Sequence, residues 1–386
     1  MIRPGVRGHR QRLHGTHIDS FTSARSGPEL TDGSVRPAGA VLTIDLSSLR
    51  ANYRLLRRKL VGATCAAVVK ADAYGLGAAH VAPALLKEGC ETFFVAHLSE
   101  GLELREVLGP GPTIYVLNGL HPGAEADCAA SGLYPVLNSD RQIAAWRRLA
   151  GKFGRPLAAA LQVDSGMARL GMSKPEVDRL AEDPSALEDI DVRLVMSHLA
   201  CADEPAQPSN ARQLQAFEAL SRRLPRAPRA LANSSGIFLG PAYHFDLARP
   251  GAALYGINPQ PDGPNPMAAV ARLQARVIQT RVVEPGEGVG YGHRFIADRR
   301  MRLATISLGY ADGWHRCATS AAWFDGLRLP FVGRVSMDSI VLDASAPGAE
   351  RLEAGDLVEL IGTHQSVDDV AAQAGTIGYE ILTSLG

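Results

Sequence analysis

The sequence lacks the features that mark several large classes of protein. Its five cysteines are odd in number and scattered, without a CxxC pair, which fits neither a disulfide framework nor a zinc site. Forty basic residues balance forty acidic residues, so no net charge attracts nucleic acid or a membrane surface. No apolar run approaches the ~18 residues of a membrane span, and no hydrophobic signal core follows the basic start. These absences predict a cytoplasmic globular chain that acts on small molecules.

The N-terminal segment, residues 1–38, differs in composition from the rest of the chain. It is rich in arginine, glycine, serine and histidine, and Asp19 is its only acidic residue before Glu29. We predict that it is disordered, because such a composition buries little apolar surface. A targeting peptide or a basic arm is one interpretation, and an extension without function is the one we favour. The folded chain is therefore expected to begin near residue 39.

Residues 39–267 alternate short apolar runs with helical patterns. The β-like runs are TCAAVVK, TFFVAH, TIYVL, YPVL, PLAAALQV, VRLVMSH, RALAN and the less regular HFDLARPGAALYG. Helix-like stretches lie between them at residues 79–89, 97–108, 140–153, 174–183 and 210–224. This alternation predicts an α/β fold, a (β/α)8 TIM-like barrel. A doubly wound sheet is the alternative, but it needs a glycine-rich dinucleotide fingerprint that the sequence does not contain.

Residues 268–386 follow a different pattern, in which strand-like runs are separated by glycine and proline. Examples are RLQARVIQTRVVEPGEGVGYGHRF, MRLATISLGYADG and LRLPFVGRVSMDSIVLD. This pattern predicts a separate, mainly-β C-terminal domain. A strand near residues 40–46 is expected to join it.

Polar residues stand at the ends of the predicted barrel strands, where barrel enzymes place their active sites. Lys70, Arg169, His198 and Asn233 all have this position. A lysine at the end of AAVVK either covers the rim with its aliphatic stem or is held at a site. The segments NSSG and RPG follow the last two predicted strands, where barrels often bind phosphate, although NSSG alone is equally typical of a helix N-cap. A lysine opposite a phosphate site suggests pyridoxal 5′-phosphate, which carries both an aldehyde and a phosphate.

A set of motifs then resembles one family over about residues 40–386. The motifs VVKADAYGLG, VDSGMARLG, MSHLA, LANSSG, RPGAALYG, GEGVGYGHRF, SLGYADGW, GRVSMD and GTIGYEIL occur in the order seen in alanine racemases. The resemblance implies interconversion of L-alanine and D-alanine by a pyridoxal-phosphate enzyme with a barrel, a β domain and a head-to-tail homodimer. It favours Lys70 as a site residue over a rim lysine.

The resemblance also implies the residues that hold the cofactor. Lys70 is the Schiff-base lysine, Tyr74 contacts the phosphate, and His198 packs against the pyridine ring. Arg249 faces the pyridine nitrogen, and because a guanidinium does not readily lose a proton, that nitrogen stays largely unprotonated. The remaining predicted cofactor residues are Asn233, Ser234, Gly251, Ala252 and Tyr379.

Racemisation removes a proton from one face of the α-carbon and returns one to the other, so two bases on opposite faces are the direct solution. By resemblance these are Lys70 and, from the partner subunit, Tyr291. A tyrosine base needs neighbouring positive charge or a hydrogen-bond network, which the family provides through His198 and Arg249. The alternative for Tyr291 is a surface turn residue, and for Arg249 a structural ion pair.

The resemblance also implies that Arg169 lies near the substrate carboxylate, with Met337 and Tyr310 of the partner completing the pocket and Asp338 at its entrance. One position departs from the family, because Gln162 stands where many relatives carry a lysine that becomes carbamylated. Glutamine cannot form a carbamate, although its amide can still hydrogen-bond to Arg169. The sequence therefore predicts an activity that bicarbonate does not stimulate.

Three other functions remain as alternatives. A serine or broad-specificity amino-acid racemase uses the same machinery. A pyridoxal-phosphate decarboxylase also has a barrel lysine and a β domain, but it lacks the GYGHRF tyrosine in this context. A single-domain cofactor carrier has no base on the opposite face, which the second domain with Tyr291 and Met337 argues against. No metal site is predicted.

Overall fold

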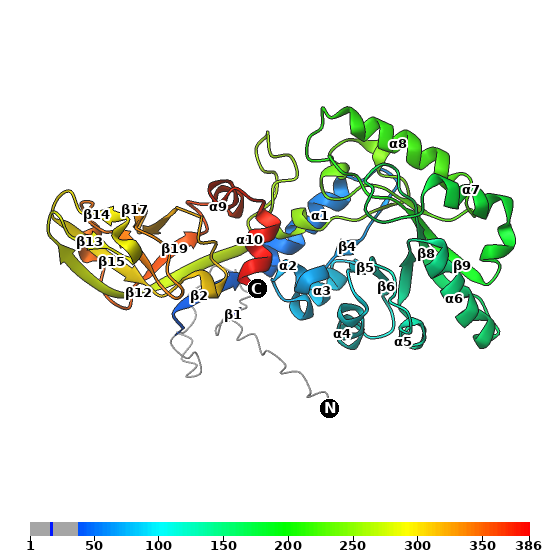
Figure 1. The fold of residues 1–386 in the computed structure, drawn as a ribbon, viewed down its shortest axis with the longest axis horizontal. Coiled ribbons are helices and arrows are strands. Elements are labelled where there is room, and N and C mark those ends of the chain that lie inside the picture. The colour runs from blue at the N-terminus through cyan, green and yellow to red at the C-terminus, as the bar shows by residue number, and fades with distance from the viewer. Residues whose placement is uncertain (1–15, 18–37) are drawn as a thin grey trace, which may run out of the picture. The chain divides into compact units, whose positions relative to one another are not determined.

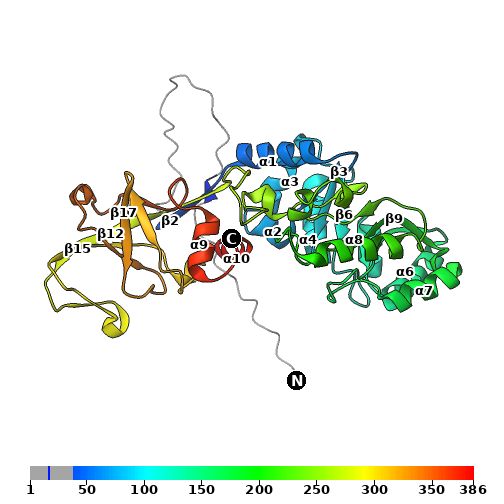
Figure 2. The ribbon, with the colours of Figure 1, turned by 90° about the horizontal axis from the view of Figure 1, so that it is seen from above.

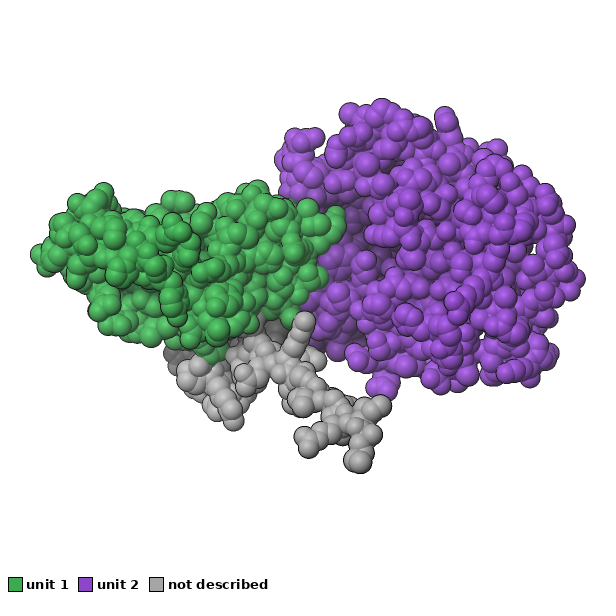
Figure 3. Space-filling view, viewed as in Figure 1, with its two compact units in different colours: residues 1–45, 271–386 green, residues 46–270 purple. Residues whose placement is uncertain are grey.

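The computed structural model describes residues 16–17 and 38–386, which fall into two compact units (Figure 3). Unit 1 combines residues 1–45 with residues 271–386, and unit 2 comprises residues 46–270. The prediction that residues 1–38 are disordered concerns a segment of which the structure describes only residues 16–17 and 38.

Unit 2 is built on short parallel strands. A seven-stranded parallel sheet has the order β10-β9-β8-β7-β6-β5-β4, and β11 pairs in parallel with β3. The strands are β3 (Thr64–Cys65), β4 (Ala67–Val68), β5 (Thr92–Val95), β6 (Thr113–Val116), β7 (Tyr134–Leu137), β8 (Leu157–Gln162), β9 (Ile190–Met196), β10 (Arg229–Ala230) and β11 (Leu247–Ala248). Sequential strands pair with one another, as expected for repeated β-α units.

The last strand closes the barrel, because β11 bonds to both ends of the sheet. On one side the amide of Ala66, between β3 and β4, donates to the carbonyl of Ala248 at 2.9 Å. On the other side the amide of Arg249 donates to the carbonyl of Ala232, next to β10, also at 2.9 Å. The predicted TIM-like barrel is confirmed.

Helices lie outside these strands in two views (Figures 1 and 2). They are α1 (Leu46–Lys59), α2 (Lys70–Tyr74), α3 (Ala78–Lys87), α4 (Leu98–Leu108), α5 (Glu125–Ala130), α6 (Asp140–Phe153), α7 (Lys174–Glu182) and α8 (Pro208–Ser221). In α6 the side chain of Ser139 caps the N-terminus and Gly154 ends the helix in the left-handed conformation. Its apolar face buries Ile143 and Trp146 against the barrel. The strands between the helices are mostly apolar, as sheets covered on both faces require.

Unit 1 contains an eight-stranded, mainly antiparallel sheet in the order β1-β2-β12-β15-β18-β17-β16-β19, which closes through a further pairing of β12 with β19. Its strands are β1 (Thr16–His17), β2 (Ala40–Ile44), β12 (Ala271–Val283), β15 (Met301–Ile306), β16 (Ala321–Phe324), β17 (Leu327–Val332), β18 (Ile340–Asp343) and β19 (Leu357–Ile361). A small hairpin, β13 (Gly288–Val289) with β14 (Phe295–Ile296), and helices α9 (Val367–Ala374) and α10 (Gly378–Leu385) complete it. The mainly-β C-terminal domain is confirmed.

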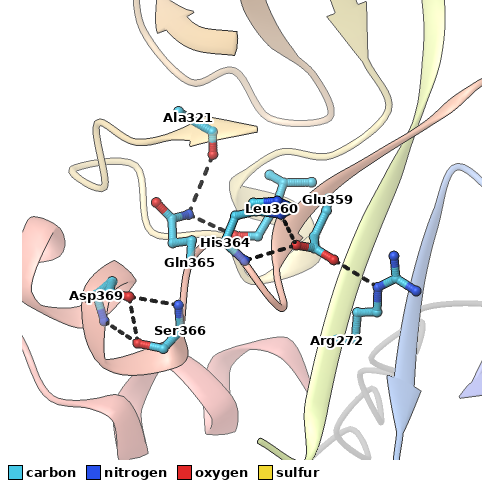
Figure 4. Close-up of polar contacts among 8 residues, drawn as sticks. All are labelled: Arg272, Ala321, Glu359, Leu360, His364, Gln365, Ser366 and Asp369. Carbon is cyan, nitrogen blue, oxygen red and sulfur yellow. Dashed lines mark hydrogen bonds and ion pairs between the residues drawn. The ribbon is translucent and has the colours of Figure 1, made fainter. Parts of the chain in front are cut away.

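A buried carboxylate ties the long strand β12 to the segment between β19 and α9 (Figure 4). Glu359 has only 8% of its side chain exposed, and its carboxylate accepts hydrogen bonds from Arg272 Nε and His364 Nδ1, each at 3.0 Å. Burial raises its pKa, but hydrogen bonds from His364 and the charge of Arg272 outweigh that effect and hold the pKa below its usual value. Next to it, Ser366 and Asp369 cap α9 through reciprocal bonds.

Within residues 16–17 and 38–386, no helix combines the length and the apolar character that crossing a membrane requires.

Candidate active site

Lys70 begins an unusual turn at the end of the first barrel strand. The next four residues, Ala71 to Tyr74, all have left-handed backbone angles, with φ values of 52°, 52°, 55° and 58°. Each such residue other than glycine costs about 1–2 kcal/mol, so the surrounding structure has to hold the turn in place. The amide of Gly75 donates to the carbonyl of Ala71 at 2.8 Å, which closes one full turn of left-handed helix. The turn determines where the half-buried Lys70 side chain starts.

Tyr74, at the end of this turn, packs against the RPG segment. Its ring lies 4.7 Å from that of Tyr255, and a Cβ atom added to Gly251 would lie 2.3 Å from the Tyr74 hydroxyl oxygen. Position 251 therefore has to be glycine for the tyrosine to occupy this place. The two segments expected to bind phosphate also contact each other, because Ser234 Oγ accepts hydrogen bonds from the amides of Gly251 and Ala253, at 3.0 and 3.1 Å.

The other predicted cofactor residues of unit 2 join the same strand ends. Ala252 is buried and begins the short helix η4 (Ala252–Tyr255). Asn233 is half-buried, and its side-chain oxygen accepts a hydrogen bond from the amide of Gly236 at 2.9 Å. That contact is the local cap which the NSSG pattern alone predicts.

Arg249 is a buried guanidinium with an incomplete set of partners. The side chain is 3% exposed, and its Nη2 donates to the carbonyl of Ser197 at 2.5 Å. Among the described residues its Nη1 has no hydrogen-bond partner, although the atom is buried. A buried donor without an acceptor is costly, so this position suits a ligand that brings an acceptor. Burial lowers the pKa of Arg249 to about 9.

Positive charges surround the site. Burial, followed by the charges of Arg249, Arg169 and Lys70, lowers the pKa of His198 to about 3, so its imidazole is neutral at physiological pH. Burial and the charge of Arg169 also lower the pKa of Lys70, against an opposing effect of Glu100. A lysine with a lowered pKa supplies more neutral amine, the form that attacks an aldehyde. The cationic surroundings favour an anionic ligand.

Arg169 lies on a loop organised by one carboxylate. Asp164 Oδ1 accepts hydrogen bonds from the amides of Gly166 and Met167, both at 2.9 Å, and from Ala168 at 3.2 Å. Burial raises the pKa of Asp164, but these amides outweigh it and keep the pKa below its usual value. Arg169 itself is exposed and forms no hydrogen bond or ion pair within the described part of the chain. It is free to meet a carboxylate.

Gln162 ends strand β8 and is 6% exposed. Its carbonyl accepts a hydrogen bond from the amide of Met172 at 2.8 Å, which fixes the backbone of the SGMARLG loop. The structure gives no hydrogen bond between its amide and Arg169, so the orienting role suggested by the sequence remains a prediction.

The predicted residues of unit 1 gather at a second place. Tyr291 is 69% exposed and lines a cavity of about 610 Å³ together with Ser336. The carbonyls of Ser336 and Met337 accept hydrogen bonds from the amides of Tyr310 and Ala311, at 3.1 and 2.8 Å. This places the loop that carries Met337 and Asp338 against Tyr310.

Two large side chains in this second group are exposed: Met337 is 57% accessible and Tyr310 is 42% accessible. Asp338 is exposed as well. The half-buried Tyr379 lies on α10, whose Ser384 Oγ is 2.9 Å from a ring nitrogen of His315 in the loop that follows Tyr310. The predicted site residues thus form one group in each unit.

Sequence reasoning missed two polar residues that hold the unit 2 group in place. Glu100 accepts hydrogen bonds from three backbone amides, one of them in the Lys70 turn. Gln213 is 2% exposed, donates to the carbonyl of His198 at 2.9 Å and accepts from the amide of Ala200 at 2.8 Å. Both lie on helices, where a glutamate or glutamine in the sequence indicates only a residue on the polar, solvent-facing side. No local signal distinguished them.

The chain matches two family models, "Alanine racemase, N-terminal domain" over residues 44–259 and "Alanine racemase, C-terminal domain" over residues 270–386. The chain belongs to the alanine racemase family. A protein of Mesorhizobium japonicum named "Alanine racemase, catabolic" is 64% identical over 349 residues, which cover 90% of this chain and 92% of that protein. An alanine racemase of Brucella canis is 52% identical over 364 residues, with 90% and 92% covered. The predicted family is confirmed.

A solved alanine racemase has the same fold and carries the predicted cofactor. The crystal structure of the Bartonella henselae enzyme, described as having covalently bound pyridoxal phosphate, superposes with a TM-score of 0.88 at 45% identity. It covers 91% of this chain and 98% of its own. Two features of this chain fit such a cofactor. Arg249 Nη1 has no partner among the described residues, and Tyr74 and Ser234 both lie against Gly251. Pyridoxal phosphate is the cofactor of this family.

Proposed function

We propose that this chain interconverts L-alanine and D-alanine, and that Lys70 binds the aldehyde carbon of pyridoxal phosphate. The observation that supports this assignment best is the buried Arg249, whose Nη1 has no partner among the described residues and suits the acceptor nitrogen of the pyridine ring. When bound, pyridoxal phosphate withdraws electrons and thereby acidifies the α-proton of an attached amino acid.

Each residue of unit 2 has a distinct task in this proposal. Ser234 and Tyr74 lie beside the backbone of residue 251, where the phosphate would bind to nearby amides. Arg249 keeps its proton and so leaves the ring nitrogen largely unprotonated. Arg169, without an ion pair among the described residues, holds the substrate carboxylate in a two-point contact.

Proton transfer requires one group on each face of the α-carbon. Lys70, once released from the cofactor by the substrate amine, removes or returns the proton on one face. Tyr291 serves the other face from a second copy of the chain, and Met337 and Tyr310 of that copy line the entrance. Its high exposure in the single chain agrees with a role at an interface. We therefore propose a homodimer, acting in the cytoplasm.

The test is a chiral assay of the purified protein with L-alanine, together with its absorption spectrum. We expect D-alanine to form, and a visible absorbance of the bound cofactor that is lost in Lys70→Ala. Tyr291→Phe should retain the absorbance but lose most of the activity, because only proton transfer is affected. Serine, lysine and arginine belong in the same assay, and alanine as a poor substrate would refute the proposal. A Tyr291→Phe variant with full activity would refute the two-base mechanism.

A further inference from the structure

The left-handed turn after Lys70 receives a contact from a helix that carries no assigned function. Within the turn, hydrogen bonds join neighbouring residues, such as the amide of Gly77 to the carbonyl of Asp72 at 2.9 Å. The amide of Ala71, the residue directly after the lysine, instead donates to Glu100 Oε1 at 2.8 Å. Glu100 belongs to α4, which follows the next barrel strand. A side chain distant in sequence therefore fixes the first peptide group of the turn.

Both oxygens of the Glu100 carboxylate are engaged. Oε2 accepts hydrogen bonds from the amides of Ala96 and His97, at 2.6 and 3.0 Å, while Oε1 takes Ala71. Hydrogen bonds to an ionised acceptor are shorter and stronger than neutral ones. One carboxylate thus connects the end of strand β5, the start of α4 and the backbone beside Lys70.

An ordinary helix cap explains only part of this arrangement. A glutamate in the first turn of a helix commonly reaches back to the preceding amides, which accounts for the bonds from Ala96 and His97. The bond from Ala71 goes beyond a cap, because that residue belongs to neither α4 nor β5. Glu103, one turn later on the same helix, is exposed, and its carboxylate has no hydrogen bond or ion pair among the described residues.

The charge of Glu100 also acts on the lysine. The pKa of Lys70 is lowered by burial and by Arg169, and the negative charge of Glu100 opposes both. His198 is neutral over the physiological range because its pKa is about 3. Glu100 is therefore an acidic group whose charge reaches Lys70, while Arg169 is the opposing cation.

We propose that Glu100 is a positioning residue for Lys70, which holds the left-handed turn through Ala71 and so aims the lysine amine at the cofactor. The inference rests on the proposed role of Lys70. The carboxylate does not itself contact the substrate. Its two contributions are a fixed backbone at residue 71 and a negative charge close enough to influence the protonation of the amine.

The test compares Glu100→Gln and Glu100→Asp with the matched control Glu103→Gln, which removes an exposed charge from the same helix. Glu100→Gln keeps the size but replaces one acceptor oxygen by a donor, and Glu100→Asp keeps the charge but shortens its reach. In the cofactor-free full chain, acetylation of Lys70 is followed against pH by mass spectrometry. We expect its midpoint to move to lower pH in Glu100→Gln, to move less in Glu100→Asp, and to stay unchanged in Glu103→Gln.

The loaded enzyme supplies the second measurement. We expect kcat for racemisation to fall about tenfold or more in Glu100→Gln, with a small change in KM. A small displacement of the Lys70 amine slows proton transfer more than it weakens substrate binding. Glu100→Asp should recover part of the rate. Thermal unfolding of each variant identifies a general loss of stability.

Two outcomes overturn the proposal. One is a folded Glu100→Gln variant with wild-type kcat and a wild-type labelling midpoint. The other is a fall in activity that follows thermal stability alone, while the labelling midpoint stays at the wild-type value. If the wild-type chain forms no D-alanine, the proposed function fails, but the labelling of the cofactor-free chain still decides whether Glu100 acts on Lys70.

Discussion

Burial and neighbouring positive charges change the protonation of the residues in the unit 2 site. A guanidinium, an imidazole and an amine are packed close together, and burial lowers the pKa of each. This burial costs stability, because it disfavours the charged forms. It also leaves a neutral imidazole and a more nucleophilic amine. The sequence indicated which residues are present, from the MSH and RPG motifs. It could not indicate their protonation, which depends on neighbours from strands β9 and β11.

His198 makes the stability of the cofactor-free chain depend on pH. Its pKa is about 3 in the folded chain and near the ordinary value of 6.5 when unfolded, so the unfolded chain binds more protons between these values. Acidification from pH 7 to pH 5 should therefore destabilise the chain by about 1–2 kcal/mol through this residue. In His198→Gln this share of the loss should disappear, as measured by denaturant unfolding at both pH values.

The exposed His80 on α3 provides the control for this experiment. His80→Gln should lose stability between pH 7 and pH 5 to the same extent as the wild type. An equal pH response of His198→Gln and His80→Gln would contradict the prediction.

Substitution of Gly251 by alanine adds a single carbon atom beside the residues expected to contact the phosphate. A Cβ atom there would lie 2.3 Å from the Tyr74 hydroxyl, so Gly251→Ala has to displace the tyrosine. Overpacking of this kind costs about 1–3 kcal/mol, and we expect the Kd for pyridoxal phosphate to rise about tenfold or more. Gly151→Ala on α6 is the control, because a Cβ atom there meets nothing within 4 Å. Fluorescence titration measures both, and equal Kd values would refute the prediction.

At the scale of elements, periodicity predicted the barrel well. The observed α6 spans residues 140–153 as predicted, and α4 begins one residue later than expected, at Leu98. The turn after Lys70 shows where such reasoning fails. Alanine favours the right-handed helix, so the letters KADAY suggest the opposite hand from the one observed. The left-handed form depends on Glu100 and on the packing of Tyr74, contacts that lie far apart in the sequence.

The strain of this turn can be measured by substituting glycine. Ala71 is exposed and has a φ of 52°, a conformation that glycine adopts without a steric penalty. We expect Ala71→Gly to raise the free energy of unfolding by about 0.5–1 kcal/mol, since relief of strain exceeds the added entropy of the unfolded chain. Ala79→Gly in the right-handed helix α3 should lower it by about 1 kcal/mol.

Chemical denaturation compares these two variants with the wild type under one set of conditions. A destabilisation of equal size in Ala71→Gly and Ala79→Gly would show that the left-handed residues carry no relievable strain. It would also weaken the case that the turn needs a contact such as that of Glu100.

At the scale of the whole molecule, the predicted site residues divide between the two compact units. Lys70 and Arg249 lie in unit 2, while Tyr291 and Met337 lie in unit 1. Motif order along the sequence was enough to predict the family and both folds. It could not place the two groups in one site, because in the proposed homodimer that depends on a second copy of the chain. An experiment on mixed chains is therefore the direct test.

A mixture of two inactive variants distinguishes a shared site from a site within one chain. If each site takes Lys70 from one copy and Tyr291 from the other, a dimer of Lys70→Ala with Tyr291→Phe contains one intact site, because both substitutions fall in the other. Refolding equal amounts together should then restore about a quarter of the wild-type activity per chain, since half the dimers are mixed and each has one working site. Each variant refolded alone is the control and should stay nearly inactive. A mixture no more active than these controls, despite confirmed mixed dimers, would mean that Lys70 and Tyr291 do not meet across an interface.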